Sequence, residues 1–161
     1  RSLKADMLNR LYEIVITQSI GEGMRILELK LKNRSYAIVP ACSMIEQLAR
    51  QLGFDKNRAE RIHLSVEEML TDRIDNAYDE SGEIRMEVLL MPHWLRLRFT
   101  DTGKEYQLDS PDASISARII LANVDAYSSH KNDAAETVYC LDFQYSDDFD
   151  VKSYLMRYKE K

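Results

Sequence analysis

Three side chains that could bind a metal ion or a phosphate group are spaced four residues apart in one stretch of this sequence. Glu68, Asp72 and Asn76 occur within RAERIHLSVEEMLTDRIDNAYD (58–79). If this stretch is a helix, residues at i, i+4 and i+8 lie along one line of its surface. Mg²⁺ prefers oxygen ligands, and a carboxylate one turn from such a metal could act as a general base. The spacing therefore fits the floor of a metal and phosphate site, and the alternative is a merely solvated helix face.

A second candidate site is the tripeptide Asp101-Thr102-Gly103, which comes directly after the alternating stretch WLRLRF. A buried carboxylate is a good acceptor for an exocyclic amine of a nucleobase. A glycine lets the backbone approach a ligand closely, because it carries no Cβ. The alternative is a plain turn at the end of a strand.

The stretch 58–79 has the pattern of a helix with one face in a core. At 100° per residue, its large and small apolar residues fall in one broad sector. Asp55 is a plausible N-cap for this helix, and Gly53 ends the preceding one. The apolar positions are Ala59, Ile62, Val66, Met69, Leu70, Ile74 and Ala77.

The remaining elements follow from hydrophobic period and from breaker residues. We expect three or four mostly antiparallel strands with the helices on one face, which is a two-layer α/β (α+β) sandwich. Residues 104–114 and 128–136 are predicted connections, and YEIVIT (12–17) is also compatible with a strand. In chain order the prediction is a helix over 1–20, a strand over 24–32, a helix over 36–52, the helix 58–79, a hairpin of strands 83–91 and 94–101, a helix over 115–127, a strand over 137–145 and a short helix within 147–161.

The composition indicates one globular domain with a sizeable core, since 45% of the 161 residues are hydrophobic and 30% are charged. The net charge of −5 favours neither nucleic acid nor an anionic membrane as a partner. The longest apolar runs are too short to span a bilayer. Cys42 and Cys140 are isolated, so we expect buried, reduced thiols in a cytoplasmic protein. The three histidines show no paired spacing, and no zinc site is predicted.

Taken in order, these motifs resemble the GHKL ATPase superfamily, which includes gyrase B, MutL and the histidine kinases. The likeness is greatest to the anti-sigma-factor serine kinases of bacterial partner-switching systems. LSVEEMLTDRIDNAYD (64–79) resembles the N box, RFTDTG (98–103) the G1 box, and the stretch from ARIILANVDAY to TVYCLDF the final helix and strand. The likeness covers roughly Ile26 to Phe143 and implies a histidine kinase-like ATPase fold. From the helical spacing that ends near Gly21-Glu22-Gly23 and from the lack of internal linkers, we expect a leading helix over 1–23 and a single domain over 24–161.

The resemblance also implies a role for each candidate residue. Glu68 would be the catalytic carboxylate that activates the nucleophile, and Asp72 would stand where the family has its magnesium-binding asparagine. Asn76 would face the nucleotide. Asp101 would accept a hydrogen bond from the adenine amino group, and Gly103 would let the backbone approach the base. The cofactor would be ATP with Mg²⁺.

The sequence departs from the family pattern at the phosphate end. The metal position is an aspartate, Asp72, whose charge would repel a triphosphate in the absence of metal. No glycine follows Gly103, so the glycine-rich G2 box is missing, and residues 110–117 read SPDASISA instead. The connection that should form the ATP lid carries Asp109 and Asp112 where basic residues would suit a phosphate.

Two functions therefore stand beside each other. The first is a degenerate GHKL-type domain that acts as a regulatory protein-binding module in bacterial signalling, with weak or no ATP binding and no required cofactor. The alternative is an ATP- and Mg²⁺-dependent protein serine kinase similar to the anti-sigma-factor kinases. Either would act on a regulatory protein such as a sigma factor or an antagonist. The leading helix permits a homodimer.

Overall fold

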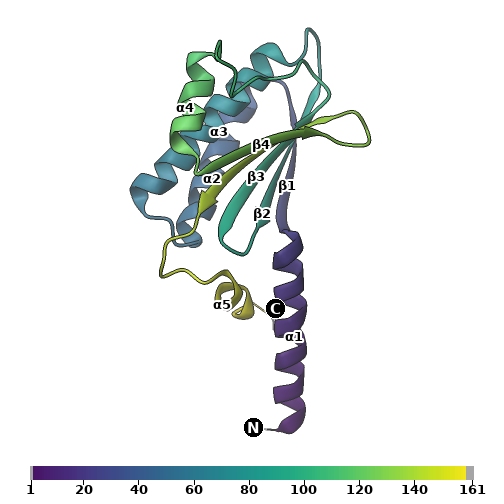
Figure 1. The fold of residues 1–161 in the computed structure, drawn as a ribbon, viewed down its shortest axis with the longest axis vertical. Helices are drawn as coiled ribbons and strands as arrows, with labels where there is room; N and C mark the ends of the chain where they lie inside the picture. The colour runs from purple at the N-terminus through teal and green to yellow at the C-terminus, as the bar shows by residue number, and fades with distance from the viewer. Residues whose placement is uncertain (1, 159–161) are drawn as a thin grey trace.

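The structure, a computed structural model, describes residues 2–158 and has one five-stranded sheet with helices packed on it (Figure 1). The helices are α1 (Leu3–Glu22), α2 (Ile38–Gln51), α3 (Lys56–Asn76), α4 (Ile115–Asn123) and α5 (Val151–Met156), with a short 3₁₀ turn η1 (Ser35–Ala37) before α2. The strands are β1 (Met24–Lys32), β2 (Glu83–Leu90), β3 (Trp94–Asp101), β4 (Ala126–Lys131) and β5 (Thr137–Gln144).

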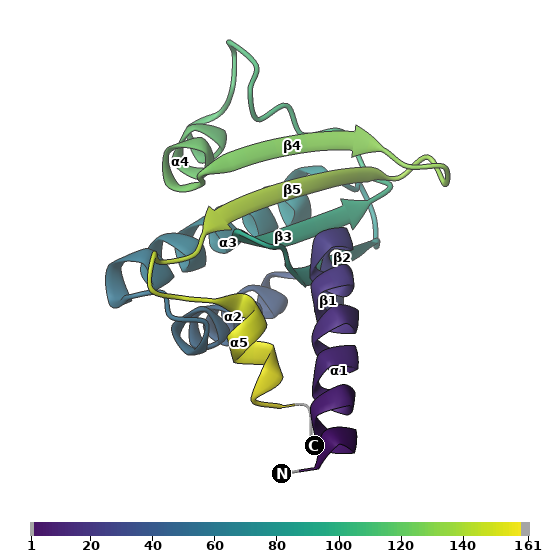
Figure 2. The ribbon, with the colours of Figure 1, turned by 60° about the horizontal axis from the view of Figure 1, so that its bottom comes forward.

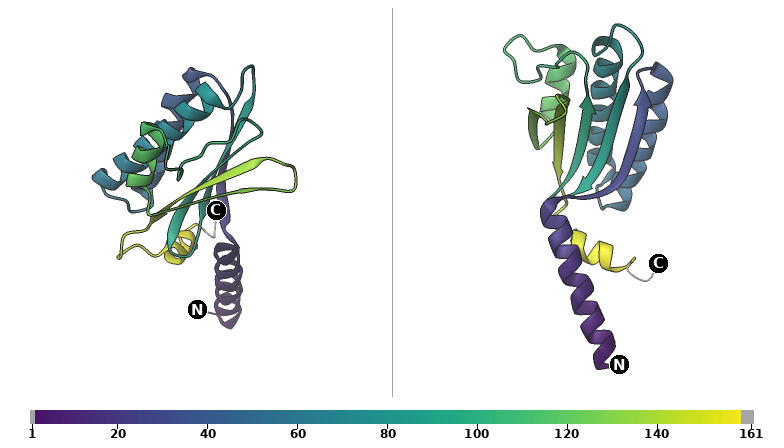
Figure 3. Two further views of the ribbon diagram at one scale, coloured as in Figure 1. Left: turned by 45° about the horizontal axis from the view of Figure 1, so that its top comes forward. Right: turned by 90° about the vertical axis from the view of Figure 1, so that its right-hand side faces the viewer.

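The strands lie in the order β1-β2-β3-β5-β4, and every neighbouring pair is antiparallel (Figure 2). Helices α2, α3 and α4 lie together over one face of the sheet, and the other face is open (Figure 3). The core lies between these two layers, where the inward side chains of the strands meet the apolar faces of the helices. The predicted two-layer α+β sandwich is therefore confirmed.

Helix α3 lies at the centre of this core, as its apolar pattern predicts. Ile62, Val66 and Met69 are almost completely buried. The Asp55 carboxylate caps the helix by accepting a hydrogen bond from the Arg58 backbone N–H at 2.8 Å. The helix ends at Asn76, three residues before the predicted end at Asp79, and the next carbonyl, that of Ala77, accepts the backbone N–H of Lys104 at 2.7 Å.

The expected strand count was wrong, because β4 was predicted as the end of a helix and the start of a loop. Helix α4 ends at Asn123, whose side-chain amide donates to the Ile119 carbonyl at 2.7 Å. The chain then pairs with β5 over Ala126–Lys131. Five of these six side chains are exposed, so the strand has no alternation to recognise in the sequence. Pairing with β5, rather than burial, forms this strand.

Helix α1 projects away from the sheet, below the start of β1 (Figure 1). It is helical from Leu3 to Glu22, so the alternative strand over 12–17 is wrong. Only Ile16 and Ile20 are buried, and Glu13 forms a 2.6 Å ion pair with Lys152 of α5. No helix in the described chain has the length and apolarity needed to cross a membrane.

Both cysteines are buried and unpaired, as predicted. Burial, followed by the nearby charges of Glu67 and Glu46, raises the pKa of the Cys42 thiol to about 12. Burial also raises the pKa of Cys140. Since the thiolate is the reactive form, both side chains act as small core residues and not as nucleophiles.

Candidate functional site

The candidate site is organised around a buried ion pair between α3 and the end of β3. The Arg73 Nε donates to Asp101 Oδ2 at 2.8 Å, and Arg73 Nη2 donates to Asp101 Oδ1 at 2.9 Å. Arg73 Nη2 also donates to the Lys104 carbonyl. The two side chains are 1% and 0% exposed, respectively. Two parallel charge-assisted hydrogen bonds in a dry site make this a strong and geometrically specific contact.

Two tyrosine rings flank the Arg73 guanidinium. Its carbon lies 5.2 Å from the centre of the Tyr139 ring and 6.0 Å from that of Tyr106. The Tyr139 hydroxyl accepts the Tyr106 backbone N–H at 2.9 Å, and burial raises the pKa of Tyr139. The aromatic faces attract the cation and keep water away from the ion pair.

Arg73 was missed at the sequence level, although a signal for it exists. It follows Met69 by four residues and Val66 by seven, so it falls in the middle of the apolar sector of α3. A charged residue at a core position requires a buried partner of opposite charge. That requirement could have linked Arg73 to Asp101.

The predicted metal position, Asp72, lies beside this ion pair and is itself engaged. Its Oδ1 accepts the Asn76 side-chain amide at 2.8 Å, and its Oδ2 accepts Arg73 Nη1 at 3.2 Å. The Asp72 side chain is only 10% exposed. Burial raises the pKa of Asp72 above its ordinary value, and the hydrogen bond from Asn76 and the charge of Arg73 offset this only in part.

Replacing Asp72 with asparagine is expected to stabilise the protein more at neutral pH than at about pH 4. Because the pKa of Asp72 is raised on folding, the folded state binds its proton more tightly than the unfolded state. Stability is therefore lost as pH rises from the ordinary aspartate pKa through the raised one, and asparagine removes that loss. The difference in melting temperature between variant and wild type should grow with pH, and a difference that shrinks would contradict this assignment.

Glu68 and Gly103 lie on either side of the ion pair. The Glu68 side chain is half-buried one turn before Asp72, and its backbone carbonyl accepts the Ser116 hydroxyl at 3.4 Å. The Gly103 N–H donates to Asp101 Oδ1 at 2.9 Å. The structure thus places Asp72, Asn76, Asp101 and Gly103 around Arg73, with Glu68 near the start of α4.

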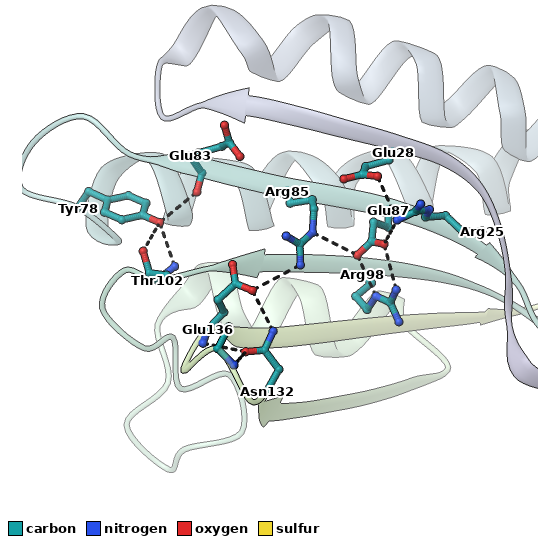
Figure 4. Close-up of polar contacts among 11 residues, drawn as sticks. Arg25, Glu28, Tyr78, Glu83, Arg85, Glu87, Arg98, Thr102, Asn132 and Glu136 are labelled. Atoms are coloured by element: carbon teal, nitrogen blue, oxygen red, sulfur yellow. Dashed lines mark hydrogen bonds and ion pairs between the residues drawn. The ribbon is translucent and has the colours of Figure 1, made fainter.

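Tyr78 fixes the turn that carries Gly103. Its hydroxyl accepts the Thr102 backbone N–H at 3.0 Å and donates to the Glu83 carbonyl at 3.0 Å (Figure 4). The turn is thus attached both to the end of α3 and to the start of β2. It is a packed part of the fold and not a free loop.

Thr137 is a second residue that sequence reasoning missed. It pairs directly with Asp101 across β3 and β5, and it is 1% exposed. Its hydroxyl has no hydrogen-bond partner among the described residues. A buried hydroxyl without a partner costs about 1–3 kcal/mol, so this position suits an additional polar partner. A threonine at the start of a strand gives no signal in the sequence.

The start of α4, where the phosphate end of the site would lie, is capped by its own side chains. At the N-terminus of α4, the Ser114 hydroxyl already accepts the Ala117 N–H at 3.1 Å. The Ser116 hydroxyl is engaged by Tyr106 at 3.1 Å. Asp109 and Asp112 are exposed on the connection before the helix. The two carboxylates would repel a phosphate that approaches this surface.

The donor set does not fit a bound ATP–Mg²⁺ in this conformation. Both Asp101 oxygens are engaged by Arg73, and both Asp72 oxygens are engaged by Arg73 and Asn76. Within residues 2–158, no group of three or more histidine, cysteine, aspartate or glutamate side chains is arranged to hold a metal ion.

Comparison with known families identifies the domain type. The family described as "Histidine kinase-like ATPase domain" matches residues 31–134, well over half of the chain. This match runs from the end of β1 past β4, so it includes every residue of the candidate site except Thr137 and Tyr139. A search among curated proteins gives no match. The chain belongs to the histidine kinase-like ATPase domain family.

Proposed function

We propose that this histidine kinase-like ATPase domain is a regulatory protein-binding module in bacterial signalling, with weak or no ATP binding. The observation that carries the proposal is the Arg73–Asp101 ion pair. On the resemblance described above, Asp101 would accept a hydrogen bond from the adenine amino group. Here a guanidinium of the same chain donates to both oxygens of that carboxylate.

The energetic cost of opening this site is large. An adenine that reaches Asp101 must first separate it from Arg73, and breaking a buried ion pair costs about 3–5 kcal/mol. Since 1.4 kcal/mol corresponds to a factor of ten, this weakens binding by roughly 10²- to 10⁴-fold. A ligand of micromolar intrinsic affinity would then have a Kd of roughly 0.1–10 mM.

The phosphate end supports the same proposal. The acidic Asp109 and Asp112 and the self-capped start of α4 replace a phosphate cradle. Asp72 adds a carboxylate whose charge disfavours a phosphate unless a metal neutralises it. We therefore regard the N box as degenerate and the G2 box as absent.

The remaining surfaces are suited to protein partners. Helix α1 exposes large apolar side chains on the side away from its two buried residues, namely Leu3, Met7, Leu8, Leu11, Ile14 and Val15. We propose a division into a leading helix (1–23), through which a homodimer could form, and one domain (24–161). The proposed partner is a cytoplasmic regulatory protein of the sigma-factor or antagonist type.

One observation favours the alternative, an ATP- and Mg²⁺-dependent serine kinase similar to the anti-sigma-factor kinases. The unpartnered hydroxyl of Thr137 lies directly across from Asp101, where a bound base could supply a polar partner. In this case Arg73 would have to move, Glu68 would act as the base, and Asp72 would bind the metal.

Thermal unfolding with and without ATP–Mg²⁺ separates the two functions. A site saturated at about 100 times its Kd stabilises the folded state by about 2.7 kcal/mol, or roughly 5–11 °C for a domain of this size. We expect no shift of the wild-type melting temperature at millimolar ATP–Mg²⁺. A shift of that size that is also lost without Mg²⁺ would reject the proposal and favour the kinase. The same protein titrated with GTP–Mg²⁺ controls for non-specific effects of nucleotide.

A further inference from the structure

Strand β1 presents an open edge. It is nine residues long and pairs only with β2 within the described chain. Its outer backbone N–H and C=O groups therefore have no strand partner. An edge of this kind can bind an extended peptide as an additional strand. Figure 3 shows β1 at the margin of the sheet, beside α2.

An apolar groove runs along this edge, between β1 and α2. Tyr36, which lines the groove, is 70% accessible, and Val39, which precedes the lining residue Pro40 in α2, is 72% accessible. Side chains that face α2 from a strand added to β1 would enter this groove, because neighbouring strands share the same alternation. The groove is lined by Leu29, Lys30, Leu31, Lys32, Tyr36, Ala37, Pro40, Ala41 and Met44.

The other face of the same strand carries Glu28, which forms an ion pair with Arg25, and two lysines, Lys30 and Lys32. Lys30 and Lys32 pair in register with Arg85 and Glu83 of β2, and neither lysine side chain forms an ion pair or a hydrogen bond within residues 2–158. The arginines on this face differ, because Arg25, Arg85 and Arg98 contact Glu87 within a network that includes Glu28 and Glu136 (Figure 4). The lysines are the cations left for an external partner.

We propose that the β1 edge and its groove bind an extended segment of a partner protein in which apolar and acidic residues alternate. This inference rests on the proposed protein-binding function and names the chemistry of the segment that is recognised. The apolar residues would lie opposite Leu29 and Leu31 and enter the groove. The acidic residues would lie opposite Lys30 and Lys32 on the open face. Backbone hydrogen bonds to β1 give affinity, and the alternation gives register.

A second copy of this chain fits the same edge less well. Two-fold pairing of β1 centred on Lys30 or Leu31 sets Lys30 opposite Lys30 or Lys32 of the other copy, whereas pairing centred on Leu29 sets Lys30 opposite Glu28. Like charges directly opposite each other on one sheet face are destabilising. The lysines thus disfavour the first two registers of self-pairing, while they favour an acidic strand.

Selection from a random peptide library displayed on phage, with the full chain immobilised, tests this inference. We expect enriched peptides to alternate apolar and acidic residues. Their synthetic forms should bind the double variant Lys30→Glu/Lys32→Glu about tenfold more weakly than wild type. Tyr36→Glu should also weaken binding, and Lys131→Glu on β4, the opposite edge strand, should leave it unchanged.

Four results would overturn the inference: no enrichment, enriched peptides without the alternation, peptides that bind the double variant as tightly as wild type, or equal loss with Lys131→Glu. Circular dichroism of each variant shows whether the fold is retained. A wild-type dimer that dissociates on dilution and is weakened by Tyr36→Glu, but not by Lys131→Glu, would assign the edge to a second copy instead. Failure of these tests leaves the proposed function open to its own test, which depends on the response to ATP and not on peptide binding.

Discussion

Replacing Arg73 with alanine is expected to lower the free energy of unfolding by about 3–5 kcal/mol. The change removes the cation and leaves the Asp101 carboxylate in a site where its side chain is 0% exposed. The Gly103 N–H would remain as a donor to one oxygen, which does not replace a charged partner. Urea unfolding, followed by circular dichroism, measures the loss directly.

Two further variants show whether the loss comes from the unpaired charge. Arg61→Ala, on the same helix, removes an exposed arginine whose side chain bonds to Asn123 and to the Ala122 carbonyl, and it should cost less than about 1 kcal/mol. The double variant Arg73→Met/Asp101→Asn removes both charges and keeps an acceptor for Gly103. It should be more stable than Arg73→Ala, because an apolar replacement of a buried ion pair is often neutral. A double variant less stable than the single one would contradict the unpaired-charge explanation.

The variant Arg73→Ala also tests whether Arg73 prevents a ligand from reaching Asp101. Arg73→Ala removes the Arg73 donors from both oxygens of Asp101, of which Oδ1 keeps the Gly103 N–H, and vacates the space beside Tyr106 and Tyr139. We expect adenine or ATP to raise the melting temperature of Arg73→Ala more than that of wild type, by mass action on the folded state. Equal responses in both proteins would mean that Arg73 does not control access to Asp101.

The layers of the fold were accessible to sequence reasoning because they follow from local periodicity. The apolar sector of α3 and the alternation in β2 and β3 specify which faces are buried, and burial dominates the free energy of folding. Strand β4 was not accessible. Most of its side chains are exposed, so they give no pattern of burial. Its conformation depends on backbone pairing with β5, a contact that the local sequence does not specify.

The sequence indicated candidate positions, whose roles remain predictions, and it did not indicate how they contact each other. Glu68, Asp72 and Asn76 were singled out by their spacing, and Asp101 by its place at the end of a strand; in the structure Arg73 contacts both Asp72 and Asp101. What spacing could not give is the partner of Asp101, since Arg73 lies 28 residues away in sequence. A scan for charged residues at core positions of α3 would have singled out Arg73, because such a residue must be paired.

Replacing Gly103 with alanine is expected to destabilise the protein by about 1–3 kcal/mol, the usual cost of overpacking. A Cβ on Gly103 would lie 2.4 Å from the Ala77 carbonyl oxygen and 2.6 Å from the Ala77 Cβ. The Ala77 oxygen is backbone and accepts the Lys104 N–H, so it cannot move away without breaking that bond. Differential scanning calorimetry of the variant measures the effect.

Gly21→Ala is the matched control, because nothing lies within 4 Å of its added Cβ and the residue is in helix α1. It should stabilise the protein by about 0.5–1 kcal/mol, since alanine is the better helix former. Opposite signs at the two glycines would show that Gly103 is required for the close contact between the β3 turn and the end of α3. That contact also sets the position of Asp101, so Gly103→Ala should disturb the Arg73 ion pair even when no nucleotide is present. If Gly103→Ala were as stable as wild type, the glycine would instead be required only for a ligand that approaches the turn from outside.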